Sequence, residues 1–250
     1  IPIRSEQGAR IRGAFIANKG NVIIAADYSQ IELRIMAHIS QDASLLDAFN
    51  HDVDVHSATA SMMFNVPLDE VTKDHRRNAK AINFGLIYGM SAFGLAKQID
   101  VSRTEAKAYI DAYFENYPGV LSYMDNTKEI AKAQGYVETV MGRRLYLPQI
   151  NAKNKMLQQH ALRTAINAPM QGSSADIIKK AMLDVYQWIG NDNTDIKMIM
   201  QVHDELVFEV KASKADEFAH KIQTLMSDTY PLDIPLVVDV GIGDSWQQAH

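Results

Sequence analysis

Cysteine is absent from this chain of 250 residues. Its absence excludes a disulfide framework, and it also excludes a metal site built from thiolates. A chain without cysteine suits a reducing compartment, which agrees with a location in the cytoplasm.

Long apolar runs are missing as well. No stretch approaches the roughly 18 consecutive apolar residues that a membrane-spanning helix needs, so we expect no membrane partner. The first residues, which read IPIRSE, show neither a signal-peptide pattern nor an initiator methionine. These features predict a cytoplasmic protein whose sequence here is part of a longer one.

Positive charge is in the minority overall, with a formal net charge of −5, which argues mildly against a nucleic-acid binder. The distribution of charge gives a different indication. Residues 73–180 carry 16 Lys and Arg against 9 Asp and Glu, whereas residues 181–250 carry 4 against 12. A basic middle beside acidic flanks fits a phosphate-binding face next to a carboxylate metal site, although solvated helices also produce such an excess.

Hydrophobic residues make up 47 % of the chain, enough to bury the core of one large domain or two modest ones. Short apolar or β-branched runs predict strands over residues 21–27, 196–202, 206–210 and 236–240. Because strands lie near both ends and a helical block lies between them, the pattern predicts an α+β fold in which the helices form an insertion.

The helical block is expected over residues 49–135, with breaks at Pro67 and at Tyr117-Pro118-Gly119. A hairpin is expected around Met141-Gly142. Further helices are predicted over residues 154–168, from Ser173 or Ser174 to Trp188, and over 213–229, with Pro169 interrupting the first two.

Asp27 ends the first apolar strand, just before a helix. A carboxylate at such an edge can stay partly solvated while it is rigidly held, as a metal ligand must be. The alternative is that Asp27 merely helps to cap the next helix. The pattern Ser29-Gln30-Ile31-Glu32 predicts a capping box at the start of that helix, which would also explain Glu32.

A second acidic pair, Asp204-Glu205, lies at a predicted tight turn between two apolar strands, directly after His203. Acidic residues in turns are common. However, hard oxygen ligands select Mg²⁺ or Mn²⁺, and two aspartates from different strands can hold a metal pair for phosphoryl transfer. We therefore expect Asp27 and Asp204 to meet in the fold.

The residues Arg76, Lys80, Phe84 and Tyr88 recur at intervals of four and would form one row on a helix, each step rising about 6 Å. Two cations followed by two aromatic rings would span roughly 18 Å, the scale of a nucleoside triphosphate beside its templating base. The residues could equally belong to a helix with a charged start and an apolar, packed end.

Arg163, Asn167 and Gln171 form another row of hydrogen-bonding side chains, although Pro169 is expected to break the helix before Gln171. Such groups suit the minor groove of DNA, where acceptors vary little with sequence. They could also be ordinary surface residues. His51 and His56, considered alone, are more typical of structural histidines than of metal ligands.

Three segments together resemble the signature motifs of family A DNA polymerases. They are Asp27-Tyr28-Ser29-Gln30-Ile31-Glu32-Leu33-Arg34, the row from Arg76 to Tyr88 followed by Gly89, and Gln201-Val202-His203-Asp204-Glu205. Their order and spacing agree with the family, and the likeness runs from about residue 1 to the final Gln-Ala-His.

The resemblance implies that Asp27 and Asp204, assisted by the backbone carbonyl of Tyr28, bind two catalytic Mg²⁺ ions, for which Mn²⁺ can substitute. Glu205 would support this site, and Lys80 would neutralise or protonate the leaving pyrophosphate.

The resemblance also implies roles in binding the substrates. The implied contacts to the incoming nucleotide are Arg76, Lys80, Phe84, Tyr88, Glu32, His56 and Gln30. Among them, Glu32 would be a steric gate against the ribose 2′-hydroxyl, closing together with Tyr88, and Phe84 would discriminate against dideoxynucleotides. The implied contacts to the primer–template are Arg163, Asn167, Gln171 and His203.

The family fold implies an antiparallel-sheet palm over residues 1–48 and 156–250, with a mostly helical fingers insertion over 49–155. The implied activity is template-directed DNA synthesis in repair and replication, with primer–template DNA and deoxynucleoside triphosphates as partners. We expect a monomer in the bacterial cytoplasm, associated with the nucleoid. Family members also carry a thumb and an exonuclease-like domain upstream, and this sequence contains neither.

Three other functions compete with this interpretation. A single-subunit RNA polymerase of the phage type shares related motifs, but Glu32 as a 2′-hydroxyl gate argues against it. A metal phosphohydrolase of the HD type could use His203-Asp204 with His51 and His56, but it needs that pair on a helix, and a strand is predicted to follow here. A DNA-binding module without catalysis would not need both aspartates.

Overall fold

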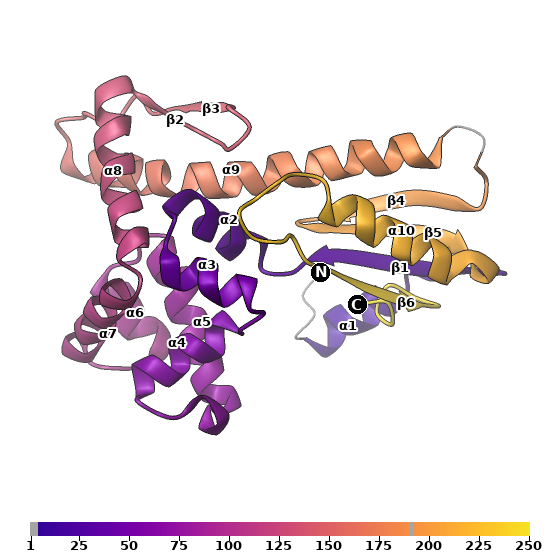
Figure 1. Ribbon diagram of the computed structural model, residues 1–250, viewed down its shortest axis with the longest axis horizontal. Helices are drawn as coiled ribbons and strands as arrows, with labels where there is room; N and C mark the ends of the chain where they lie inside the picture. Colours follow the sequence, from indigo (N-terminus) through magenta and orange to yellow (C-terminus); the bar gives the residue numbers. More distant parts are fainter. Residues whose placement is uncertain (1–4, 191–192) are drawn as a thin grey trace. The chain divides into compact units, whose positions relative to one another are not determined.

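The computed structural model describes residues 5–190 and 193–250, and its chain groups into two compact units (Figure 1). The first unit comprises residues up to Ile31 together with Ser174–His250, and the second comprises Glu32–Ser173. An antiparallel sheet with flanking helices forms the first unit and a mainly helical body forms the second, so the predicted α+β class is confirmed.

The sheet of the first unit has the strand order β4-β5-β1-β6, and neighbouring strands are antiparallel. Its strands are β1 (Asn21–Tyr28), β4 (Ile196–Val202), β5 (Glu205–Lys211) and β6 (Val238–Gly243). The first three confirm the predicted strands. The last begins two residues later than predicted, after Pro235, which has no backbone N–H to donate to a neighbouring strand.

The core of this unit lies between the sheet and α10 (Ala215–Ser227), which packs on β6 and β1. Ile24 in β1, Phe208 in β5 and Ile222 in α10 are fully buried there. The predicted helix over 213–229 is thereby confirmed. A short 3-10 helix, η2 (Ala212–Lys214), directly precedes it. A further helix, α1 (Glu6–Gly13), precedes the sheet.

The second unit is built mainly from helices, as predicted for residues 49–135 (Figure 1). Its elements are α2 (Ile31–Ser40), α3 (Ala43–Asn50), α4 (Val55–Phe64), η1 (Leu68–Glu70), α5 (Lys73–Ile87), α6 (Ala92–Ile99), α7 (Arg103–Asn116), α8 (Pro118–Gln134), β2 (Tyr136–Glu138) and β3 (Arg144–Tyr146). The predicted breaks at Pro67 and Tyr117-Pro118 are confirmed, and so is the hairpin around Met141-Gly142.

The predicted interruption at Pro169 is wrong, because α9 runs unbroken over Lys155–Ile189. A proline removes one helical hydrogen bond, which costs about 3 kcal/mol in an isolated helix. Here Ala165 and Met170 on either side are fully buried, and their packing holds the helix through that defect. Ser173 is no N-cap: it is buried within the helix, and its hydroxyl donates to the Pro169 carbonyl at 2.5 Å.

The predicted capping box at Ser29 is also wrong. Gln30 has φ +53°, in the left-handed region, and α2 begins only at Ile31. The Ser29 N–H, which a capping box would direct to Glu32, donates instead to the Val237 carbonyl at 2.8 Å. Glu32 is therefore available for another contact.

None of the helices in the described ranges, 5–190 and 193–250, has both the length and the apolar character required to cross a bilayer.

Replacing Ser173 by Ala should lower the free energy of unfolding by about 1 to 3 kcal/mol, since its buried hydroxyl donates to Pro169 and accepts the Val140 N–H at 2.9 Å. Urea unfolding followed by circular dichroism measures the change. The neighbouring substitution Ser174→Ala is the control and should alter stability by less than about 0.5 kcal/mol. Equal effects of the two substitutions would contradict the assigned role of Ser173.

Candidate active site

Acidic residues distant in sequence gather at one end of the β1 strand. Asp27 on β1 pairs in register with Glu205 on β5 and with Asp239 on β6. Asp204 lies in the two-residue turn before β5, and its carbonyl accepts the Tyr28 N–H at 3.3 Å. The sheet register thus brings Asp27 and Asp204 together, and it adds Asp239, which the sequence analysis missed.

The electrostatics of this cluster disfavour negative charge on Asp27. Burial and, to a smaller extent, the neighbouring charges of Asp204, Glu205 and Asp239 together raise the pKa of Asp27 to about 7. The pKa of Asp204 is raised as well, mainly by burial. Asp27 Oδ1 is buried and receives no hydrogen bond from the described residues. Uncompensated carboxylates of this kind favour a bound cation.

The donor set fits a hard divalent ion that completes its coordination with substrate oxygens. Within residues 5–190 and 193–250, no three His, Asp or Glu side chains converge as a closed metal cage. Mg²⁺ is usually held by one or two carboxylates together with substrate phosphates rather than by such a cage. Asp27 and Asp204 meet that requirement. Tyr28 is rigidly placed beside them, because its buried hydroxyl donates to the Met226 carbonyl at 2.7 Å.

Glu205 is engaged elsewhere. It is 3 % exposed, and its Oε1 accepts the indole N–H of Trp246 at 2.6 Å while its Oε2 lies 3.0 Å from Nδ1 of His250. Both oxygens of this carboxylate therefore already have a partner within the first unit. The predicted turn is confirmed, with His203 exposed at its tip and in the left-handed region at φ +54°. Since Glu205 begins a strand, the His-Asp pair is not on a helix, as an HD-type phosphohydrolase would need.

In the second unit, the predicted row lies along α5 and ends at its C-cap residue, Tyr88. Arg76 and Lys80 are exposed, while Phe84 and Tyr88 are half-buried. The Lys80 ammonium lies 5.9 Å from the centre of the Phe84 ring, and the Phe84 and Tyr88 rings stack with centroids 6.1 Å apart. The four side chains therefore form one continuous face, with charge at one end and aromatic surface at the other.

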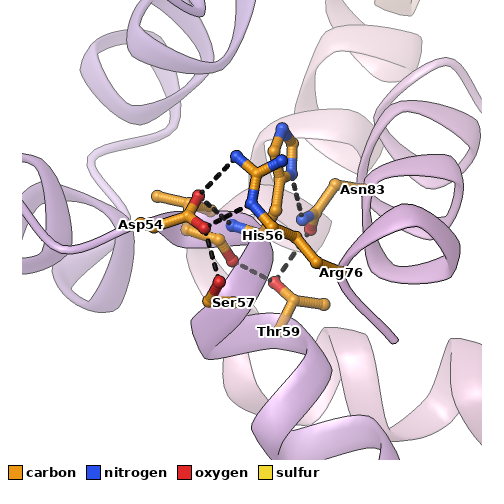
Figure 2. A network of polar contacts seen from close by, with 7 residues as sticks. Asp54, His56, Ser57, Thr59, Arg76 and Asn83 are labelled. Carbon is orange, nitrogen blue, oxygen red and sulfur yellow. Dashed lines mark hydrogen bonds and ion pairs between the residues drawn. The ribbon is translucent and has the colours of Figure 1, made fainter. Parts of the chain in front are cut away.

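A network of buried polar side chains packs beneath these four residues and holds them in place (Figure 2). His56 on α4 is 1 % exposed, and its Nδ1 is paired with the Asn83 amide nitrogen at 3.0 Å. Asn83 is oriented in turn by the Thr59 hydroxyl, which donates to Asn83 Oδ1 at 3.1 Å. Since the Asn83 amide donates to Nδ1, the proton of neutral His56 lies on Nε2. Nε2 is buried and has no hydrogen-bond partner among the described residues.

Burial lowers the pKa of His56 to about 4, against the opposing charge of Asp54 and together with the repulsion of Arg76 and Lys80. The imidazole is therefore neutral near pH 7. It lies 5.7 Å from the Phe84 ring, centre to centre, so it belongs to the same face as the α5 row.

Asp54 is a residue of this face that the sequence analysis missed. Its carboxylate accepts from Arg76 Nε at 2.6 Å and from Arg76 Nη2 at 3.3 Å, and Figure 2 shows this fork. Burial raises the pKa of Asp54, but hydrogen bonds from Arg76 and Ser57 outweigh it and leave that pKa below its usual value. Asp54 also caps α4 by accepting the His56 backbone N–H at 3.2 Å, a pattern that could have been read as an N-cap.

The end of the row contacts two other predicted residues. The Tyr88 hydroxyl donates to Glu32 Oε2, and Arg163 Nε donates to the Tyr88 carbonyl at 3.0 Å. Because α9 is unbroken, Arg163, Asn167 and Gln171 recur on one helical face, and Asn167 Oδ1 is buried with no partner in the described part of the chain.

Two predicted residues stand apart from these contacts. Gln30 belongs to the first unit, and its side-chain oxygen is buried without a partner among the described residues. His51 is exposed, and its ring is paired with Asp47 on its own helix turn, at 3.1 Å.

Comparison with known proteins relates the whole chain to polymerases. Residues 1–248 match the family profile described as DNA polymerase family A. The chain is 59 % identical over 250 residues to DNA polymerase I of Pseudomonas aeruginosa and 46 % identical to DNA polymerase I of Bacillus subtilis. All of this chain is covered in both cases, but it spans only 27 % and 28 % of those relatives' lengths.

A solved structure has the same fold. It is the polymerase domain of Pol1 from M. smegmatis in complex with DNA primer–template and dNTP, with a TM-score of 0.96 and 48 % sequence identity. The match covers 100 % of this chain and 44 % of that one.

Substituting Asp27 by Asn should stabilise the metal-free protein at pH 8. Because the pKa of Asp27 is raised on folding, its ionisation opposes folding, and this cost grows between about pH 4 and pH 7 and then levels off. We expect a gain of about 1 to 2 kcal/mol, allowing for solvent screening of the partly exposed carboxylate.

Urea unfolding in a chelator, compared across pH, measures this gain, with Asp228→Asn as an exposed control. Mg²⁺ should then stabilise the wild-type protein more than the Asp27→Asn variant. A variant that is less stable than the wild type at pH 8 without metal would contradict the electrostatic picture of this cluster.

Proposed function

The chain belongs to DNA polymerase family A, and we propose that it adds deoxynucleotides to a primer 3′-hydroxyl by two-metal-ion phosphoryl transfer, releasing pyrophosphate. The observation that best supports this proposal is the meeting of Asp27 on β1 with Asp204 in the turn before β5, where both carboxylates have raised pKa values. Such a pair is suited to hold the metal ions that in-line phosphoryl transfer needs.

In this proposal Asp27, Asp204 and the backbone carbonyl of Tyr28 hold two Mg²⁺ ions, which Mn²⁺ can replace. When bound, the ions make the 3′-hydroxyl more acidic and neutralise the charge that develops on the triphosphate. Glu205 keeps the acidic turn in place without binding a metal itself, since Trp246 and His250 occupy its carboxylate.

The α5 face would hold the incoming nucleotide. Arg76 binds phosphate as a planar fork and Lys80 binds it as a point charge, and Lys80 can also protonate the leaving pyrophosphate. Neutral His56 would offer a phosphate oxygen its buried Nε2–H, which has no partner among the described residues.

The aromatic end of the face would read the sugar and the base. Phe84 contacts the deoxyribose and disfavours dideoxynucleotides, and Tyr88 stacks near the base. Glu32, held by the Tyr88 hydroxyl, closes the space that a ribose 2′-hydroxyl would need. Gln30 lies two residues before Glu32 and is assigned to nucleotide binding in the same segment.

The primer–template is assigned to Arg163, Asn167, Gln171 and His203, whose hydrogen-bonding groups suit the minor groove. The related M. smegmatis domain is described as bound to primer–template and dNTP. We further propose a palm over residues 1–48 and 156–250 with fingers over 49–155, in a monomeric polymerase of the bacterial cytoplasm and nucleoid that serves repair and replication.

Primer extension tests this function in the intact protein that contains this chain. With Mg²⁺ and dNTPs, a labelled primer should grow as its template directs, while Asp204→Ala should lower the rate by at least about 100-fold, on the order of the loss of one preorganised electrostatic contact. Lys107→Ala, a change to an exposed lysine of α7 paired with Asp111, is the control and should be silent. Growth that persists in Asp204→Ala would contradict the proposed role of the carboxylates.

Substituting Glu32 by Ala should raise the incorporation of ribonucleotides relative to deoxynucleotides, because it opens the space beside the 2′-carbon. We expect a change of at least about 100-fold in the ratio of kcat/KM values, on the order of 3 kcal/mol. Tyr88→Phe, which removes only the hydroxyl that contacts Glu32, should give a smaller change in the same direction. An unchanged ratio in Glu32→Ala would exclude Glu32 as the gate.

A further inference from the structure

Glu205 is held by a segment from the far end of the described chain. Trp246 and His250 each bind one oxygen of its carboxylate, at 2.6 and 3.0 Å, although they lie more than 40 residues away in sequence. The Trp246 ring is 2 % exposed, so its hydrogen bond to Glu205 is shielded from water. A charge-assisted hydrogen bond in such surroundings is among the stronger polar contacts a protein makes.

Trp246 is itself fixed by residues that precede the sheet. The guanidinium of Arg12 lies 4.1 Å from the centre of the Trp246 ring, and Phe15 meets the ring edge-on with centroids 5.7 Å apart. The Trp246 backbone N–H also donates to the Phe15 carbonyl at 2.9 Å. Arg12 and Phe15 therefore contact the ring of Trp246, and Phe15 also binds its backbone. Together these contacts hold the indole N–H in its position beside Glu205.

Two glycines of β6 let this segment approach the sheet. A Cβ placed at Gly241 would lie 2.1 Å from the Ala249 carbonyl oxygen, and one at Gly243 would lie 2.5 Å from Gln248 Cβ. Neither gap admits a side chain, so the segment lies directly on β6. The same segment helps to line a cavity of about 310 Å³ together with Asp27 and Asp239.

We propose that residues 246–250 act as a clamp that positions the acidic turn for catalysis, with Trp246 and His250 as positioning residues that work through Glu205. This inference rests on the proposed polymerase function. Glu205 is adjacent to Asp204 in sequence and opposite Asp27 in the sheet register. Fixing its carboxylate therefore fixes the backbone that presents Asp204.

The clamp also restricts the movement of the Glu205 carboxylate, which lies close enough for its charge to act on Asp27. An unheld Glu205 carboxylate could rotate toward Asp27 and compete with Asp204 for the metal ions. Holding both of its oxygens with N–H donors disfavours that movement.

The test compares Trp246→Phe, which keeps an aromatic ring for Arg12 but removes the N–H donor, with Trp188→Phe as the matched control. Trp188, the other of the chain's 2 tryptophans, packs against Phe218 on α10. His250→Ala removes the other donor at a partly exposed position, so it tests the clamp even if Trp246→Phe unfolds. The measurements are kcat, the KM for dNTP, the melting temperature, and Mn²⁺ binding in the absence of DNA by electron paramagnetic resonance.

We expect Trp246→Phe and His250→Ala to lower kcat at least fivefold and to weaken Mn²⁺ binding at least threefold, with the KM for dNTP unchanged within twofold. Trp188→Phe should leave all three values as in the wild type. Wild-type kcat and Mn²⁺ binding in both clamp variants would overturn the inference, and so would a loss that merely follows the melting temperature in all variants. An inactive wild-type protein would instead overturn the proposed function, and this inference with it.

Discussion

The pairing of β1 with β5 and β6 is the constraint on which the candidate active site depends. It places Asp27 opposite Glu205 and Asp239, with Asp204 in the adjoining turn. These like charges repel one another, and burial makes their ionisation more costly still. The sheet and its apolar core overcome that cost, so the chain holds ready a cluster of carboxylates that a divalent cation would complete.

The side chains of the α5 face are held in place in a different way. Its cations and aromatic rings depend on helical spacing, but their support comes from the buried pair of His56 and Asn83. Arg76 already has a carboxylate partner in Asp54, at 2.6 Å. A phosphate group that binds Arg76 must therefore replace or share this ion pair. The ion pair thus lowers the affinity for phosphate, but it also holds the guanidinium in place.

Local patterns predicted what depends on neighbouring residues: the strands around Asp27 and Asp204, the row on α5 and most helices. They failed where contacts between residues distant in sequence determine the local structure. Packing carries α9 through Pro169, and the Val237 carbonyl takes the Ser29 N–H that a capping box needs. Trp246 could not be assigned either, because its partner Glu205 is 41 residues away and only the folded sheet brings them together. The roles of the site residues came from a family resemblance rather than from spacing.

Binding of Mn²⁺ to the protein with a dideoxy-terminated primer–template and the matching dNTP tests the central claim most directly, since no chemistry can follow. Electron paramagnetic resonance should detect two spin-coupled Mn²⁺ ions roughly 3.5 to 4 Å apart. The coupled signal should vanish in Asp27→Asn and in Asp204→Ala and persist in Lys107→Ala. A single uncoupled ion, or a coupled pair that survives the loss of either aspartate, would contradict the assignment of these carboxylates as the ligands of a two-metal site.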